Sequence, residues 1–102
     1  MANQARRISF TRSGGFAGIT LSVDVDAAKE PEKLRYITNE LSNLKPTAPS
    51  AKMYDRFVYT FVVIYENNNR REYVVPEDSL PAALHPVVND LVQRARRGGR
   101  NY

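Results

Sequence analysis

Two adjacent glycines, Gly14 and Gly15, separate two runs in which apolar and polar residues alternate. A glycine pair in this position favours a tight hairpin turn, because such a turn needs positive φ angles that glycine adopts without steric cost. The chain therefore begins with a predicted β-hairpin, whose strands we place at residues 7–12 and 17–25. This hairpin limits the fold to one that contains an antiparallel sheet.

The turn also predicts a register and two faces for the hairpin. With the glycine pair as the two turn residues, Phe10 pairs with Ile19. Ile8 then pairs with Leu21, and these four apolar side chains form the buried face. The strand period of two places Phe16 on the opposite face. Two positions stay open for Phe16: its ring faces water at the hairpin tip, or the hairpin bends and the ring enters the core.

A helix is predicted after the hairpin. Pro31 suits a first helical turn, and the acidic residues Glu30 and Glu32 suit the positive end of the helix dipole. The helix should end before Pro46, which lies in an exposed loop over residues 45–53. Its apolar stripe, spaced by three, four and three residues, consists of Leu34, Ile37, Leu41 and Leu44.

A third strand is predicted over residues 55–66, where almost every residue from 57 to 65 is β-branched or aromatic. Neither face of this strand is polar. We therefore expect a central strand that is covered on much of both faces.

Three asparagines at 67–69 predict a turn, and residues 70–75 predict a fourth strand that pairs back. The turn can use two or three of the asparagines. This choice determines whether Tyr73 lies on the face of Phe61 or on the face of Val62.

A second helix is predicted after a capping residue, either Asp78 or Ser79, with Pro81 near its first turn. Pro86 indicates that the helix is kinked there or begins there. Gly98 should end it. The apolar stripe comprises Leu80, Leu84, Val87, Val88, Leu91, Val92 and Ala95.

The element order β-β-α-β-β-α predicts an α+β fold. We expect one antiparallel sheet of about four strands, with two helices packed on one face. The length of 102 residues suits one domain, which we place at residues 1–97, followed by a disordered basic tail at 98–102. We expect a monomer, and the strand order is not determined by the pattern.

The composition excludes several classes of function. The chain has no cysteine, which excludes disulfides and thiolate chemistry. No apolar run approaches the length of a membrane span, and residues 1–7 contain no apolar leader, so we expect a cytoplasmic protein.

Catalytic groups are also sparse. His85 is the only histidine, and it lies next to Pro86 in an apolar helix, which favours a structural role. Asp24 and Asp26 share a strand face, but they lie where a strand ends in solvent. The glycine-rich stretch is followed by a strand and not by a helix, so it is no phosphate loop. We expect a non-enzymatic binding protein without a metal or cofactor.

The net charge is +4, and six arginines near the two ends of the chain supply it; subtracting them leaves −2. Four of them lie at the C-terminal end: Arg94, Arg96, Arg97 and Arg100. They suggest either a contact for nucleic acid or an acidic protein, or compensation of the helix dipole.

Three stretches resemble the emfourin family, with a likeness that runs from Arg7 to Arg97. The stretches are Arg12-Ser13-Gly14-Gly15-Phe16-Ala17-Gly18-Ile19, Asp55-Arg56-Phe57-x-Tyr59-x-Phe61, and Glu77-Asp78-x-Leu80-Pro81 leading to Leu84 and Leu91. Emfourins are small protein inhibitors of thermolysin-like zinc metallopeptidases, in particular of the protealysin-like branch. The resemblance implies inhibition of such an enzyme, with that enzyme as the partner.

This implied function suggests a role for the glycine-framed hairpin. A stiff projection could enter the cleft of the enzyme, with Phe16 as its apolar anchor and Arg12 meeting acidic residues of the cleft. The expected contacts are Arg12, Ser13, Gly14, Gly15, Phe16, Ala17 and Gly18. Secondary contacts are expected from the exposed loop, at Pro46, Pro49 and Lys52.

Overall fold

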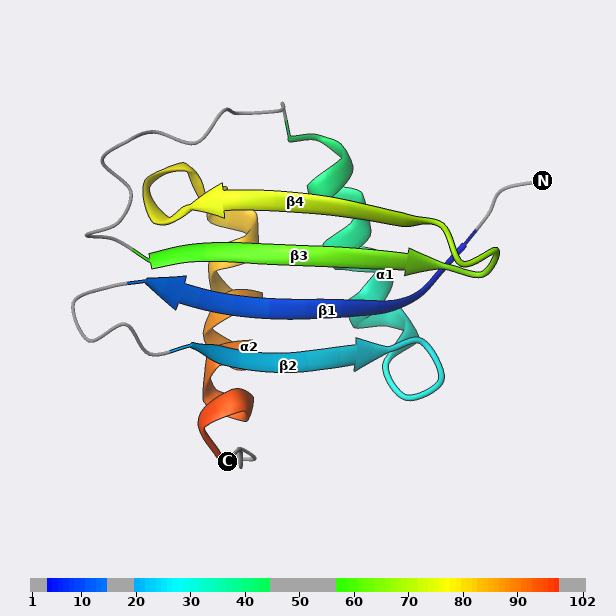
Figure 1. Cartoon of the computed structure of the whole chain (residues 1–102), viewed down its shortest axis with the longest axis horizontal. Coiled ribbons are helices and arrows are strands. Elements are labelled where there is room, and N and C mark those ends of the chain that lie inside the picture. Colours follow the sequence, from blue (N-terminus) through cyan, green and yellow to red (C-terminus); the bar gives the residue numbers. More distant parts are fainter. Residues whose placement is uncertain (1–3, 15–19, 45–56, 98–102) are drawn as a thin grey trace.

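A single antiparallel sheet organises the computed structural model, which describes residues 4–14, 20–44 and 57–97. The strand order is β2-β1-β3-β4 (Figure 1). The elements are β1 (Ala5–Gly14), β2 (Leu21–Asp26), α1 (Pro31–Ser42), β3 (Phe57–Tyr65), β4 (Arg70–Pro76), the short 3₁₀ helices η2 (Glu77–Ser79) and η3 (Ala82–Leu84), and α2 (His85–Arg97). The predicted α+β class and element order are confirmed.

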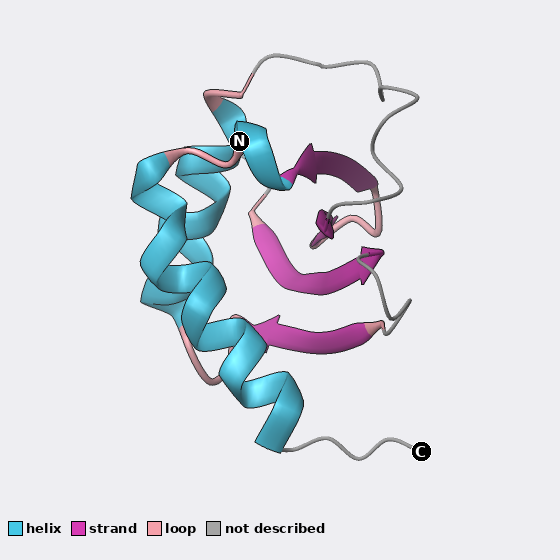
Figure 2. Ribbon diagram, turned by 90° about the vertical axis from the view of Figure 1, so that its left-hand side faces the viewer, coloured by secondary structure: helices cyan, strands magenta, loops and turns pink. Residues whose placement is uncertain are grey.

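Both α-helices lie on the same face of the sheet (Figure 2). The prediction that β3 is central is confirmed, and no side chain of β3 is exposed on either face, although the described helices cover only one of them. Its side chains alternate between buried and half-buried, with Tyr59, Phe61 and Val63 buried. On the other face β-branched neighbours such as Val62 and Ile64 shield one another only in part. A strand without a polar face is therefore compatible with a sheet that the helices cover on one side.

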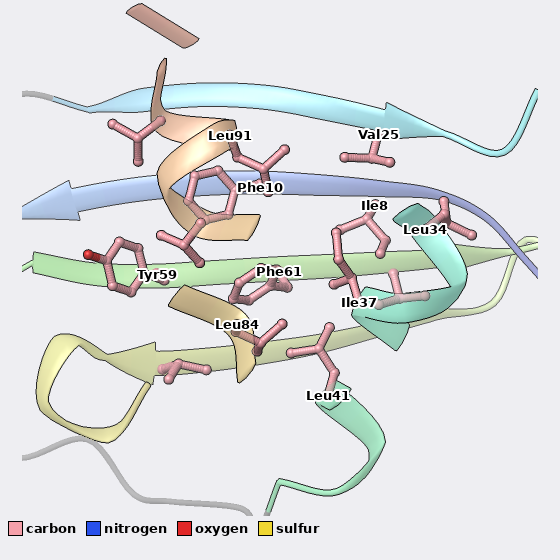
Figure 3. Close-up of a cluster of buried hydrophobic side chains, with 14 residues drawn as sticks. Ile8, Phe10, Val25, Leu34, Ile37, Leu41, Tyr59, Phe61, Leu84 and Leu91 are labelled. Atoms are coloured by element: carbon pink, nitrogen blue, oxygen red, sulfur yellow. The ribbon is translucent and has the colours of Figure 1, made fainter. Parts of the chain in front are cut away.

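The core lies between this sheet and the two helices. Phe10 of β1 is fully buried at its centre, with its ring 5.2 Å from the Phe61 ring and 6.0 Å from the Tyr59 ring (Figure 3). Aromatic pairs at such separations add to the free energy gained from burying their area. The helices contribute the predicted stripe positions, among them Leu34, Ile37, Leu41, Leu84, Val88 and Leu91.

The predicted register of the first hairpin is wrong by four residues. Phe10 pairs with Val23, where we predicted Ile19, and Ile8 pairs with Val25, where we predicted Leu21. Because the shift is even, the side chains of β2 keep the faces that alternation predicts. Val25 is accordingly buried on the helix side.

Gly14 explains the difference in register. It has a φ of 90°, yet it does not form a tight turn: it extends β1 along β3, where it pairs with Phe57. The second strand begins at Leu21, which pairs with Arg12, and not at residue 17. Residues 15–19, the loop at 45–53 and the tail at 98–102 lie outside the described residues, so the two positions considered for Phe16 remain untested.

The alternatives for Tyr73 and Pro86 are resolved, whereas the predicted cap of the second helix at Asp78 or Ser79 is wrong, because both residues lie in η2. Tyr73 pairs with Phe61 and therefore shares its face. The second α-helix begins at His85, so that Pro86 lies in its first turn. A proline there breaks no hydrogen bond of the helix, because the first amides of a helix have no partner within it.

The observed register predicts which engineered cysteine pair forms a disulfide. Thr11 and Ser22 are directly paired, and their side-chain oxygens lie 3.4 Å apart. Thr11→Cys with Ser22→Cys should therefore crosslink under mild oxidation, as measured by mass and free-thiol assay. Thr11→Cys with Gly18→Cys, the pair expected from a two-residue glycine turn, is the control and should remain reduced. The reverse result would contradict the register.

Candidate functional site

Four strand ends meet on one side of the sheet, which we call the glycine end. It comprises Arg12–Gly14 at the end of β1, Leu21 at the start of β2, Phe57–Tyr59 at the start of β3, and Glu77 just after β4. In Figure 1 it is the left-hand side of the sheet, where β1 and β4 end and β2 and β3 begin. The chain leaves β1 and enters both β2 and β3 at this end, so the connection between β1 and β2 begins and finishes there.

The side chain of Arg12, a charged residue of the glycine end, packs against β3. Its guanidinium carbon lies 4.1 Å from the centre of the Phe57 ring, which is a cation–π geometry. Arg12 pairs directly with Tyr59 across the strands, and its Nε atom is buried without a hydrogen-bond partner. The side chain is thus held against the neighbouring strand, and it is only half-exposed.

Glu77 ties the start of β3 to the end of β4. Its Oε1 atom accepts a hydrogen bond of 3.3 Å from the backbone amide of Phe57. Burial, and secondarily the charge of Glu77, raise the pKa of Tyr59, whereas the Arg12 charge acts in the opposite direction. Tyr59 therefore stays neutral at physiological pH, as its position in the core requires.

The structure describes three of the seven predicted hairpin contacts. Arg12 faces the helix side, Ser13 faces the other side opposite Val58, and Gly14 continues the strand. The remaining hairpin contacts and all three secondary contacts lie outside the described residues: Gly15, Phe16, Ala17, Gly18, Pro46, Pro49 and Lys52.

Sequence reasoning assigned no site role to Phe57, Tyr59 or Glu77. Phe57 and Tyr59 reach Arg12 through the pairing of β1 with β3, and Glu77 reaches Phe57 from the end of β4. The strands are more than 40 residues apart, and no local pattern specifies their register. The one available signal was the likeness to the emfourin pattern, which contains Phe57, Tyr59 and Glu77.

The C-terminal arginines occupy a different part of the fold. Arg94 donates to both carboxylate oxygens of Glu30, with one of these bonds at 2.6 Å, and its Nε atom lies 3.3 Å from Asp90. Lys33 binds the same two carboxylates. This helix-pair ion cluster (Glu30, Lys33, Asp90 and Arg94) joins the start of α1 to α2. Arg96 and Arg97 are exposed, and Arg100 lies outside the described residues.

The ion pairs of the helix-pair ion cluster shift the pKa values of three of its members. The hydrogen bonds from Arg94 are the largest cause that lowers the pKa of Glu30 to about 2. The bond from Lys33 likewise lowers the pKa of Asp90, and the pKa of Arg94 is raised by Glu30. Each of these three shifts favours the charged form of its group, so the cluster is structural in character.

The other titratable residues that we considered have local partners. Asp24 lies 3.6 Å from Arg7, and Asp26 accepts a hydrogen bond from the Ala28 amide at 2.9 Å. His85 is exposed, with its Nε2 atom 3.2 Å from the Leu80 carbonyl oxygen. Within the described ranges, no three His, Cys, Asp or Glu side chains gather in a group that could hold a metal ion. The helices in these ranges are too short or too polar to cross a membrane.

Comparison with known protein families gives a match over most of the chain. The family model described as Emfourin matches residues 10–92. Neither the search of the curated proteins nor the search of the solved structures gave a match. The matched span contains Arg12, Gly14, Phe57 and Glu77, so the whole glycine end lies within it.

The helix-pair ion cluster predicts a specific dependence of stability on pH. The pKa of Glu30 falls from 4.5 to about 2 on folding, so its pairing stabilises the protein fully above pH 4.5 and is lost as pH falls toward 2. Arg94→Gln should lower the free energy of unfolding at pH 6 by about 1–2 kcal/mol. It should also flatten the loss of stability between pH 4.5 and 2. Urea unfolding across this range measures both effects.

Arg96→Gln is the matched control, because Arg96 is exposed in the same last turn of α2. Its unfolding free energies should follow those of the wild type. If Arg94→Gln also gave a curve parallel to that of the wild type, the role of the cluster would be contradicted.

Proposed function

The chain belongs to the emfourin family, and on this basis we propose that it is a non-enzymatic inhibitor of a thermolysin-like or protealysin-like zinc metallopeptidase. Membership in this family supports, in general terms, an inhibitor-type function with a protease as partner. Our proposal adds the class of enzyme and the surface that contacts it.

The glycine end is the surface that we propose for this contact. The observation that supports it is the position of Gly14, which carries β1 past the start of β2 and pairs with Phe57 at the end of the sheet. The residues between Gly14 and Leu21 are thereby joined at both ends to paired strands. Because both ends of this segment are fixed to the sheet, it loses less conformational entropy when it binds a partner.

In the proposed mechanism the segment after Gly14 enters the active-site cleft and excludes substrate. Phe16 serves as the apolar anchor in the pocket of the enzyme on the primed side of the zinc, since buried aromatics are frequent hot spots of interfaces. Arg12 holds the end of β1, from which the segment starts, against β3 by its contact with Phe57. We therefore assign Arg12 a positioning role in addition to the predicted contact with acidic residues of the cleft.

The nucleic-acid alternative has less support. It depended on four C-terminal arginines, and Arg94 is engaged by Glu30 and Asp90. A polyanion would have to compete with these two carboxylates for the Arg94 guanidinium. Inhibition of a protease requires no such rearrangement.

Inhibition assays on two hairpin variants test the proposal. Phe16→Ala removes the anchor and should raise the inhibition constant for a thermolysin-like peptidase by about 30-fold or more, which corresponds to a hot-spot loss of about 2 kcal/mol. Gly14→Val should also weaken inhibition, because a β-branched residue is strained at a φ of 90°. Val74→Ala, on the exposed surface of β4, is the control and should inhibit like the wild type.

Thermal unfolding separates binding from folding in these variants. Phe16→Ala should unfold near the wild-type temperature, so that its weaker inhibition reports contact with the enzyme. Unimpaired inhibition by both Phe16→Ala and Gly14→Val would exclude the glycine end as the contact surface.

A further inference from the structure

β4 forms one edge of the sheet, and in Figure 1 it is the uppermost strand. It spans seven residues, from Arg70 to Pro76, and among the described strands it pairs with β3 alone. An edge strand leaves half of its backbone groups without a partner in its own sheet, which makes it a template for a further strand. Folded proteins therefore either protect such an edge or use it as an interface.

The β3–β4 turn determines which residues of β4 bond to β3. The Tyr65 amide donates to the Asn69 carbonyl at 2.9 Å, which makes these two residues a hydrogen-bonded pair at the turn. Hydrogen-bonded and non-hydrogen-bonded pairs alternate along an antiparallel ladder. The register therefore directs the backbone groups of three residues toward β3, namely Arg71, Tyr73 and Val75.

The backbone groups of the alternate residues point away from β3. These residues are Arg70, Glu72 and Val74. Pro76 follows the same parity, since it lies opposite Val58 at a position where the ladder requires no N–H. Val74 is also 39% exposed, which is high for a large hydrophobic side chain of the described residues. The outer side of β4 thus offers both backbone groups and apolar surface to a partner.

The opposite edge of the sheet, β2, is protected by its own residues. The Ala27 amide donates to the Arg6 carbonyl at 3.0 Å, so the same alternation directs the backbone groups of three exposed residues outward. They are Ser22, Asp24 and Asp26. The side-chain charge on this edge is only negative, which repels a second copy of the same edge, whereas β4 carries charges of both signs.

The charges at the two ends of β4 make the strand complementary to itself. Arg70 and Arg71 begin the strand. Glu77 and Asp78 follow directly after its last residue. Two β4 strands in antiparallel order bring the basic start of each strand next to the acidic end of the other, whereas parallel order brings like charges together. Arg70 and Arg71 lie on opposite faces of the strand, so each arginine approaches the acidic end of the second copy from its own face.

We propose that the chain associates with a second copy of itself through β4, with the two strands antiparallel about a two-fold axis. The two sheets then form one continuous sheet, with the helices of both copies on the same side. A two-fold contact uses the same surface on both copies and closes on itself, so association stops at the dimer. This inference does not rest on the proposed function.

A single strand pair is a small interface, and we expect a weak dimer. Stable complexes bury about 1,600 Å² in total, and smaller interfaces belong to transient encounters. We therefore expect a dissociation constant of about 0.1–1 mM, which corresponds to about 4–5 kcal/mol. The monomer expected from the sequence thus describes the protein in dilute solution.

Amide hydrogen exchange of the full chain, measured by NMR at two protein concentrations, tests the proposal. The amides of Glu72 and Val74 should exchange about threefold more slowly at three times the dissociation constant than in dilute solution, because about two-thirds of the chains are then paired. The amides of Tyr73 and Val75 bond to β3 and should be equally protected at both concentrations. Sedimentation equilibrium measures the stoichiometry in the same samples.

A proline variant tests the edge itself. Val74→Pro removes one outward N–H and no hydrogen bond to β3, so it should abolish the dependence on concentration while the fold is kept. Ser22→Pro, at an outward position of β2, is the matched control and should associate like the wild type. Thermal unfolding verifies that both variants are folded.

A charge exchange tests the antiparallel order. Arg71→Glu and Glu77→Arg each place like charges together at both ends of the strand pair, and each should raise the dissociation constant at least threefold. The variant that carries both substitutions restores opposite charges and should associate more tightly than either single variant.

Three results would overturn the proposal. They are amides of Glu72 and Val74 whose exchange is independent of concentration, a folded Val74→Pro variant that associates like the wild type, and a double charge variant no tighter than the single ones. Protection of these amides only after a thermolysin-like peptidase is added would also overturn it, and would assign the edge to the peptidase. If Val74→Pro failed to fold, the exchange of the wild-type amides would decide the question alone.

Discussion

The pairing of β1 on both of its sides is the constraint on which the rest of the structure depends. In the core, the ring of Phe10 packs against the rings of Tyr59 and Phe61, which fixes β1 against β3. The pairing with β3 continues to Gly14, beyond the last residue that pairs with β2. The same ladder therefore buries the core and sets where the connection between β1 and β2 begins.

The elements and their faces were predictable from the sequence because their signals are local. Leu34, Ile37 and Leu41 recur at a helical spacing, and all three are buried. The alternation of apolar residues in β2 correctly predicted which of its side chains face the core. The register error of four residues did not change these faces, because four is even. The start of the first helix followed from Pro31, which lies at its first position.

The register and the partners at the site were not predictable, because they depend on strands and helices far apart in the sequence. A glycine pair permits a tight turn but does not require one, and the ladder to β3 extends through Gly14. Neither the approach of Phe57 to Arg12 nor that of Glu30 to Arg94, 64 residues away, has a local signal. The second face of β3 is half-buried and carries β-branched residues, which suit half-buried positions as well as buried ones.

The central claim is that the glycine end of the sheet contacts a thermolysin-like peptidase. The most direct measurement is cross-saturation NMR of the labelled protein in complex with such an enzyme, which reports the amides at the interface. We predict the strongest signal losses at residues 12–18, which include the proposed anchor Phe16, with no loss at residues 69–71. Losses confined to residues 69–71 or to the end of α2, with Arg12–Gly14 unaffected, would contradict it.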